Sequence, residues 1–180
     1  MITQIDFAVL DWIQLHLRSS FMDALVPIIT LFSEGGVFWI GLTVLLLILP
    51  KTRKYGVAML FSLALDVLLC NILIKPLIAR PRPYTHRPEL TLLVDQLKDF
   101  SFPSGHTAIA FAGASSLLFS KVKWGIPALI LAALIGLSRL YLYVHYPTDV
   151  LAGAALGIAC GALGAFLAKT SCKIYKKREI

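Results

Sequence analysis

Two long apolar runs constrain this chain more than any other feature of its sequence. Residues 37–50 (VFWIGLTVLLLILP) and 124–137 (WGIPALILAALIGL) contain no charged side chain. Of all residues 58% are hydrophobic and 15% are charged, whereas about a quarter of the residues of a soluble domain carry charge. In a bilayer the backbone must satisfy its own hydrogen bonds, which leaves helices and closed barrels as spanning structures. We therefore expect an all-α integral membrane protein, a polytopic helix bundle.

The apolar segments predict five spanning helices, since about 20 apolar residues are needed to cross a bilayer. They lie near residues 36–50, 55–76, 105–120, 124–143 and 148–168. No polar or low-complexity linker divides them, so residues 1–180 are expected to form one domain. It would comprise an N-terminal segment at 1–35, the helix bundle at 36–170 and a basic tail at 171–180.

The N-terminal segment is less apolar than the predicted spans. Apolar side chains recur at roughly helical spacing within residues 4–17, and Asp6 and Asp11 fall between them. This pattern is typical of a helix that lies in the membrane interface. Residues 21–33 are apolar but short, and they contain Pro27. They fit a half-inserted segment or a shortened sixth span, and we favour the half-inserted segment.

The charges are divided unequally between the two ends of the predicted bundle. The connections at 51–54 and 121–123 and the C-terminal segment carry ten Lys and Arg residues against one acid, Glu179. The opposite end carries seven Lys and Arg residues against eight acids. Short loops rich in Lys and Arg remain in the cytoplasm, so we place the basic end and the C-terminus there. This orientation accounts for the net charge of +7, and no nucleic-acid partner is expected.

Three polar stretches, far apart in the sequence, converge at the non-cytoplasmic end of this bundle. KPLIARPRP (75–83) ends the second predicted span, and FPSGHT (102–107) begins the third. SRLYLYVHYPTD (138–149) joins the end of the fourth span to the start of the fifth. Charged groups at membrane depth are costly and mark functional sites. We therefore expect one site built from all three stretches.

The cations of these stretches are suited to holding a phosphate. They are Lys75, Arg82 and Arg139, with Arg80 as an accessory candidate. Arginine forks match phosphate oxygens in geometry, and lysine adds a point charge. Ser104 and Gly105 stand at a predicted helix start, where free backbone N–H groups and the helix dipole attract an anion. A phosphate is therefore the expected ligand.

Two histidines and an aspartate add the groups that phosphoryl transfer requires. His145 and Asp149 are four residues apart, and Pro147 between them suits the first turn of a helix. Asp149 would fix one tautomer of His145 and leave the other imidazole nitrogen free as a nucleophile. His106, from a different helix, would serve as the general acid. Together with the cations, these groups predict a phosphoryl-transfer site.

Taken one at a time, these residues also have ordinary structural explanations. Lys75 fits a side chain that snorkels from a helix end, Arg139 a headgroup contact and His106 a helix cap. Asp66, a further accessory candidate, lies within the second span about two and a half turns from Lys75. We expect it to be a structural partner of Asn71. The coincidence of so many groups at one end favours a site over the separate explanations.

The three stretches also resemble a known signature. They match without a gap the motifs K-x6-RP (75–83), PSGH (103–106) and SR-x5-H-x3-D (138–149). The chain thus resembles the type 2 phosphatidic acid phosphatase superfamily of membrane lipid phosphatases, over roughly residues 20–170. One departure is Tyr143, where many members have a small residue. The short N-terminal region is similar to that of short bacterial members that act on undecaprenyl diphosphate.

The resemblance implies a mechanism that uses neither a metal nor a cofactor. His145 would attack phosphorus and become phosphohistidine, with support from Asp149. His106 would protonate the leaving oxygen and later activate water. The implied phosphate-binding residues are Lys75, Arg82, Ser104, Gly105 and Arg139. The sequence has no carboxylate cluster of the kind that holds a metal, in agreement with this mechanism.

The favoured function is hydrolysis of undecaprenyl diphosphate to undecaprenyl phosphate at the outer face of the cell membrane. Phosphatidylglycerophosphate or phosphatidic acid is the alternative substrate, and transfer of the phosphoryl group to an acceptor lipid is the alternative reaction. A transporter would use the cations but has no need of two histidines. Vanadium-dependent haloperoxidases share the motifs, but known examples are soluble. The connection 84–103, with its apolar LTLLV, is expected to form a lip over the lipid tail.

Overall fold

The computed structural model describes residues 2–178, with side chains for residues 3–171. All regular elements within that range are helical, as the sequence predicts. The α-helices are α1 (Ile2–His16), α2 (Ser20–Leu31), α3 (Val37–Ile48), α4 (Arg53–Asp66), α5 (Lys75–Ile78), α6 (Gly105–Phe119), α7 (Gly125–Tyr141) and α8 (Pro147–Arg178). A π-helix, η2 (Val67–Ile74), joins α4 to α5, and the 3-10 helices are η1 (Glu34–Gly36) and η3 (Pro83–His86). The last part of the predicted basic tail, residues 179–180, lies outside the described residues.

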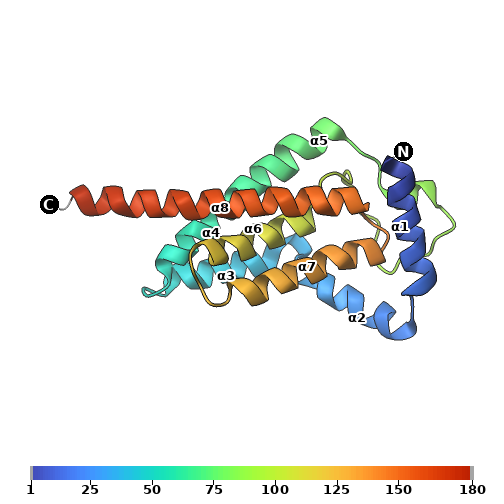
Figure 1. The fold of residues 1–180 in the computed structure, drawn as a ribbon, viewed down its shortest axis with the longest axis horizontal. Helices are drawn as coiled ribbons and strands as arrows, with labels where there is room; N and C mark the ends of the chain where they lie inside the picture. The colour runs from blue at the N-terminus through green and yellow to red at the C-terminus, as the bar shows by residue number, and fades with distance from the viewer. Residues whose placement is uncertain (1, 179–180) are drawn as a thin grey trace.

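Most helices run along the long axis of the molecule, and α1 lies across one end of it (Figure 1). Three stretches are long and apolar enough to cross a membrane: Ser20–Ile48, Arg53–His86 and Pro147–Ser171. The apolar helices α6 and α7 are shorter, with 15 and 17 residues. Each of the five predicted spans therefore coincides with a helix.

The first predicted span, 36–50, is too short on its own. At 1.5 Å per residue, the 12 residues of α3 cover about 18 Å of a hydrocarbon core about 30 Å thick. Residues 21–33, favoured above as a half-inserted segment, form α2 and lead through η1 directly into α3. Gly35 and Gly36 have positive φ at this junction, where the chain bends between the two helices. By length and composition, the stretch Ser20–Ile48, which contains α2, η1 and α3, is long enough to cross.

Helix α6 lies inside the bundle, where it contacts α4, α7 and α8. Nine of its residues are buried, and seven of these are Ala, Gly or Ser. Small side chains allow helices in a membrane to approach closely. On α8, Gly153, Gly157 and Gly161 recur at four-residue spacing and face α6. A Cβ atom at Gly157 would lie 2.3 Å from the carbonyl oxygen of Ala108, so this contact admits only glycine.

We expect Gly157→Ala to destabilise the bundle, because the added methyl group meets backbone that cannot yield without separating α6 from α8. Overpacking of this kind costs about 1–3 kcal/mol of unfolding free energy. Gly41→Ala on α3 is the matched control, since nothing lies within 4 Å of its added Cβ atom. Thermal unfolding in detergent should give a lower midpoint for Gly157→Ala than for Gly41→Ala. Equal midpoints would contradict the close approach of the two helices.

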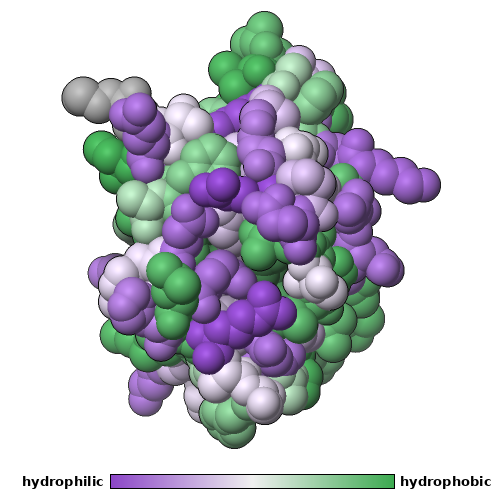
Figure 2. Space-filling view, turned by 90° about the vertical axis from the view of Figure 1, so that its right-hand side faces the viewer, coloured by the Kyte–Doolittle hydropathy of each residue, from purple (hydrophilic) through white to green (hydrophobic). Residues whose placement is uncertain are grey.

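The flanks of the bundle are apolar, and one end is polar. Ile126, Ile130 and Leu134 of α7 are exposed and share one helix face, which suits contact with lipid tails. Figure 2 looks onto the end that carries α1 and shows hydrophilic side chains gathered across it, with hydrophobic side chains toward its edges. We call this end of the molecule the α1 end.

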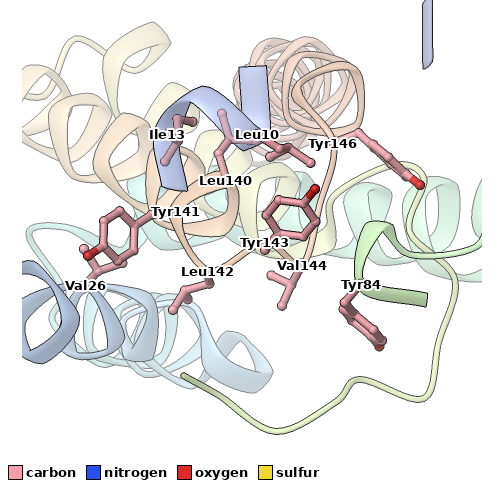
Figure 3. Close-up of a cluster of buried hydrophobic side chains, with 10 residues drawn as sticks. All are labelled: Leu10, Ile13, Val26, Tyr84, Leu140, Tyr141, Leu142, Tyr143, Val144 and Tyr146. Atoms are coloured by element: carbon pink, nitrogen blue, oxygen red, sulfur yellow. The ribbon is translucent and has the colours of Figure 1, made fainter. Parts of the chain in front are cut away.

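Helix α1 turns its polar face toward the rest of the protein. An interfacial helix is expected to expose its polar side chains, yet Asp6 is buried and Asp11 accepts a hydrogen bond from the Tyr143 hydroxyl at 2.7 Å. The apolar Trp12 and Leu15 are exposed instead. Beside these carboxylates, Leu10 and Ile13 pack over the end of α7 and the connection that follows it (Figure 3). The helix is thus held to the bundle by hydrogen bonds that its own sequence pattern does not reveal.

Candidate active site

The three polar stretches of the sequence come together at the α1 end. Lys75 begins α5, and Ser104 is the N-cap of α6. Arg139 lies in the last turn of α7 and Asp149 in the first turn of α8, with His145 in the connection between these helices. All five side chains are buried. The helices bring them together because each helix begins or ends at this depth.

Local backbone geometry directs the residues after α5 into the site. Ala79 has a left-handed backbone, with a φ of 48°, and this conformation ends α5. The chain then turns back, so Arg82 reaches the connection between α7 and α8 and donates from Nη1 to the carbonyl oxygen of Val144 at 2.8 Å. In the same way, Pro147 begins α8 and sets the start of the helix that carries Asp149.

His145 and Asp149 form the buried pair that the sequence predicts. Nδ1 of His145 lies 3.4 Å from Oδ2 of Asp149, longer than a well-formed hydrogen bond. The other ring nitrogen, Nε2, lies 3.1 Å from Nη1 of Arg82, an obligatory donor, so Nε2 is the acceptor nitrogen. Burial lowers the pKa of His145 below its ordinary value, although Asp149 opposes the effect. The imidazole is therefore neutral at pH 7, with the lone pair of Nε2 directed toward the cations.

Several donors fix the carboxylate of Asp149. Its Oδ2 accepts hydrogen bonds from the Ser101 hydroxyl and, at 3.0 Å, from the backbone N–H of Tyr146. Its Oδ1 accepts from Nη1 of Arg80 at 2.6 Å. Arg80 also donates from Nη2 to Asp6 at 2.7 Å. Arg80, the accessory candidate among the cations, is thus held between two carboxylates.

Lys75 and Arg82 converge on one carboxylate, that of Asp99 in the connection 84–103. Lys75 Nζ donates to Oδ2, and Arg82 Nη2 donates to Oδ1 at 2.5 Å. Burial raises the pKa of Asp99, but the hydrogen bonds and charges of Lys75 and Arg82 outweigh it and lower the pKa to about 2. The Asp99 side chain is still 51% exposed. Two cations are thus arranged to hold a single oxyanion that solvent can reach.

The start of α6 lies beside these cations. A Cβ atom at Gly105 would lie 3.5 Å from Lys75 Nζ and 3.2 Å from Asn71 Oδ1, so glycine keeps this approach free of a side chain. The backbone N–H of Ser104 donates to the carbonyl oxygen of Asp149 at 3.1 Å and ties α6 to the start of α8. The first N–H groups of a helix are otherwise unpaired and favour a nearby anion.

His106 and Arg139 lie at the same end and contact residues from the first part of the chain. His106 Nε2 lies 3.2 Å from Glu34 Oε2, and Arg139 Nη1 donates to the Thr30 hydroxyl at 2.5 Å. Among the described residues, no hydrogen-bond partner is present for Nε of Arg139.

A cavity of about 460 Å³ opens beside Arg139. It is lined by Glu34, Leu92, Leu93, Val94, Asp95, Leu97 and Arg139. Its apolar wall includes residues of the LTLLV segment, which the sequence predicts to be a lip. A cationic group therefore borders a space with an apolar wall on the side of the connection 84–103.

Asp66 does not join this site. It is fully buried in α4, and neither of its carboxylate oxygens has a hydrogen-bond partner in the part of the chain that the structure describes. The predicted pairing with Asn71 is wrong: the Oδ1 atom of Asn71 lies near Gly105 instead. Side chains that meet along an α-helix are three or four residues apart, whereas Asp66 and Asn71 are five apart, with Asp66 at the end of α4 and Asn71 within the π-helix η2.

Five further residues take part in these contacts, and none of them is among the site residues predicted from the sequence. They are Asp6, Thr30, Glu34, Asp99 and Ser101. Asp99 and Ser101 lie within four residues of the start of the PSGH motif, and this proximity is the signal in the sequence that points to them. The other three come from α1, α2 and η1, and no local pattern distinguishes them from surface residues.

Comparison with known proteins identifies a family and two similar proteins. The PAP2 superfamily model matches residues 55–171. An undecaprenyl-diphosphatase of Sulfolobus acidocaldarius is 40% identical over 120 residues, 66% of this chain and 58% of that protein. The undecaprenyl-diphosphatase BcrC of Bacillus subtilis is 32% identical over 146 residues, 81% of this chain and 75% of that protein.

A solved structure is also similar to this one. It is that of a transmembrane PAP2-type phosphatidylglycerolphosphate phosphatase from Bacillus subtilis, with a TM-score of 0.75 and 30% sequence identity. The match covers 96% of this chain and 86% of the other. By contrast, the chain spans less than two thirds of the length of the Sulfolobus relative.

Proposed function

Since this chain belongs to the PAP2 superfamily, we propose that it is a membrane lipid phosphatase. The observation that carries the proposal is the convergence of Lys75 and Arg82 on one carboxylate beside the buried His145. Cations that hold an oxyanion next to a neutral imidazole fit a phosphate that is attacked by that imidazole. The relatives named as phosphatases support the same reaction.

In the proposed reaction, Nε2 of His145 attacks phosphorus. A bond forms between Nε2 and phosphorus while the bond from phosphorus to the leaving oxygen breaks, and His106 gives that oxygen a proton. Asp149 stabilises the positive charge that develops on the imidazole. Water activated by His106 then attacks phosphohistidine, which breaks the nitrogen–phosphorus bond and releases inorganic phosphate.

We assign the binding of the phosphate to the surrounding donors. These are Lys75, Arg82, Arg139, Ser104 and Gly105. The phosphate would take the place that the Asp99 carboxylate occupies between Lys75 and Arg82. The solvent exposure of Asp99 supports this exchange, because the carboxylate has room to leave. No metal ion is needed, since the cations supply the charge that a metal would otherwise provide.

We propose undecaprenyl diphosphate as the substrate, with phosphatidylglycerophosphate as the alternative. The two undecaprenyl-diphosphatases among the relatives support the first, and Leu92, Leu93 and Val94 offer apolar contact for a lipid chain beside Arg139. The basic connections at the opposite end favour an orientation in which the α1 end faces outward from the cell membrane. The reaction would then occur on the extracytoplasmic side.

Purified protein in detergent should release inorganic phosphate in the presence of a metal chelator. We expect kcat/KM for undecaprenyl diphosphate to exceed that for phosphatidylglycerophosphate or phosphatidic acid by at least about tenfold, a difference of about 1.4 kcal/mol in transition-state binding. Failure to release phosphate from any lipid of the panel would refute the proposed function. Faster release from another lipid would correct the substrate only. Label found on an acceptor lipid, in place of free phosphate, would show a phosphotransferase.

A further inference from the structure

The N-terminal helix places a buried carboxylate behind the pair assigned to the nucleophile. Asp6 of α1 is 1% exposed, although acidic side chains are almost never fully buried unless they are paired. Its Oδ1 accepts a hydrogen bond from the backbone N–H of Thr148 at 3.0 Å. Its Oδ2 accepts from the Thr148 hydroxyl and from Arg80 Nη2, each at 2.7 Å. The carboxylate is therefore bound from the start of α8 and from the segment after α5.

Arg80 connects Asp6 to Asp149. One nitrogen of its guanidinium, Nη2, binds Asp6, and the other, Nη1, donates to Asp149 at 2.6 Å. The guanidinium carbon lies 3.7 Å from the centroid of the Tyr146 ring, which holds the fork from one face. Asp149 in turn faces His145 through its other oxygen. Asp6, Arg80, Asp149 and His145 thus form a row of carboxylate, guanidinium, carboxylate and imidazole.

The row has an electrostatic consequence for His145. A guanidinium paired with Asp149 alone would neutralise the charge that must orient the imidazole and stabilise its cation. Asp6 also pairs with that guanidinium, so the positive charge of Arg80 cancels less of the negative potential that Asp149 exerts at His145. The balance matters here because the other charged groups that act on His145, Arg82 and Arg139, are both positive.

We propose that Asp6 is a positioning residue for phosphoryl transfer. It acts through Arg80 on Asp149, and through Asp149 on the orientation and basicity of His145. The inference rests on the proposed function. It also extends the site beyond the part of the chain that the family model matches, because that match begins at residue 55 and α1 precedes it. Helix α1 is then a part of the reaction site as well as a cover for the α1 end.

Asp6→Asn in the full chain tests the inference, because asparagine keeps the shape of the side chain and removes its charge. We expect kcat for lipid phosphate release to fall by about 10- to 100-fold, the usual effect of losing a partner that orients a reacting group. KM should change by less than about twofold, since the substrate does not touch Asp6. A purely structural defect would instead lower the amount of active protein and the unfolding midpoint.

Asp11→Asn is the matched control. Asp11 lies on the same helix and accepts a hydrogen bond from the Tyr143 hydroxyl, in the connection between α7 and α8, at 2.7 Å; its ion pair is with Arg87, and not with Arg80. The Asp11→Asn variant shows the effect of a loosened α1 alone, and we expect its kcat to stay within about twofold of wild type. Arg80→Gln provides a second comparison. In that background Asp6→Asn should cost much less, because the charge that Asp6 balances is gone.

The outcomes separate the two proposals. If the wild-type protein releases no lipid phosphate, the proposed function fails and the inference fails with it. If the wild type is active and Asp6→Asn keeps its kcat, the inference alone is wrong. Equal losses of kcat in Asp6→Asn and Asp11→Asn would also overturn it. So would a loss of kcat from Asp6→Asn in the Arg80→Gln background as large as its loss in the otherwise wild-type protein. Should Asp6→Asn not fold, Arg80→Lys keeps the charge without the fork, and a wild-type kcat in that variant would overturn the inference.

Discussion

His145→Ala is expected to abolish lipid phosphate release, with a loss of at least about 10⁴-fold in kcat. The variant lacks the nitrogen that would attack phosphorus, and the remaining histidine of the site, His106, is assigned to the leaving oxygen and to the attacking water. The fold should survive the change. Arg82, which loses a contact with the ring, keeps its hydrogen bond to Val144 and its ion pair with Asp99.

The measurement combines steady-state phosphate release with quenching in alkaline denaturant, in which phosphohistidine is stable, after brief exposure to labelled substrate. Wild-type protein should carry acid-labile label on histidine, and His145→Ala should carry none. His16→Ala is the matched control, because His16 is exposed at the end of α1 and stacks only on Trp12. It should retain wild-type release and labelling. Release from His145→Ala at the wild-type rate would refute the proposed nucleophile.

Arg82→Lys should lower kcat/KM for the lipid substrate by about 10²- to 10³-fold, the range seen when one donor to a developing oxyanion is removed. The substitution retains the positive charge, so a loss of this size would come from geometry. Arg82 uses Nε, Nη1 and Nη2 at once: on the Asp99 backbone at 2.9 Å, on Val144 at 2.8 Å and on the Asp99 carboxylate. A lysine side chain has a single nitrogen, so it cannot bind the backbone oxygens of Asp99 and Val144 and the anion at the same time.

Arg87→Lys is the comparison for this variant. Arg87 belongs to the same segment and pairs with Asp11 at 3.0 Å, but its side chain is 42% exposed and lies outside the proposed site. Its activity should remain within about twofold of wild type, as is usual for an exposed ion pair. If Arg82→Lys retains half of the wild-type kcat/KM or more, the fork of Arg82 is not required for holding the phosphate.

Much of the candidate site could be predicted because its residues lie at helix ends. The apolar segments set where each helix begins and ends, so Lys75, Arg139 and Asp149 had to share one depth. The short-range pair of His145 and Asp149 follows from a spacing of four residues across the start of α8. The surroundings of Asp66 and Asn71 could not be predicted, because the two residues are five apart and Asn71 lies in a π-helix, whose wider turns the sequence pattern does not reveal.

The sequence by itself determined the membrane-embedded helices and the end of the bundle at which the polar motifs meet, because hydrophobic length fixes depth. Only the tertiary structure decided which partners each cation meets. Arg80 and Arg82 are two residues apart in one motif, yet Arg80 is bound by Asp6 and Asp149, whereas Arg82 holds the exposed Asp99. These partners lie 17 to 74 residues away in the chain and reach the arginines by lateral packing of helices and connections. Lateral packing depends on the fit of side chains between helices, which hydrophobic length and motif spacing do not encode.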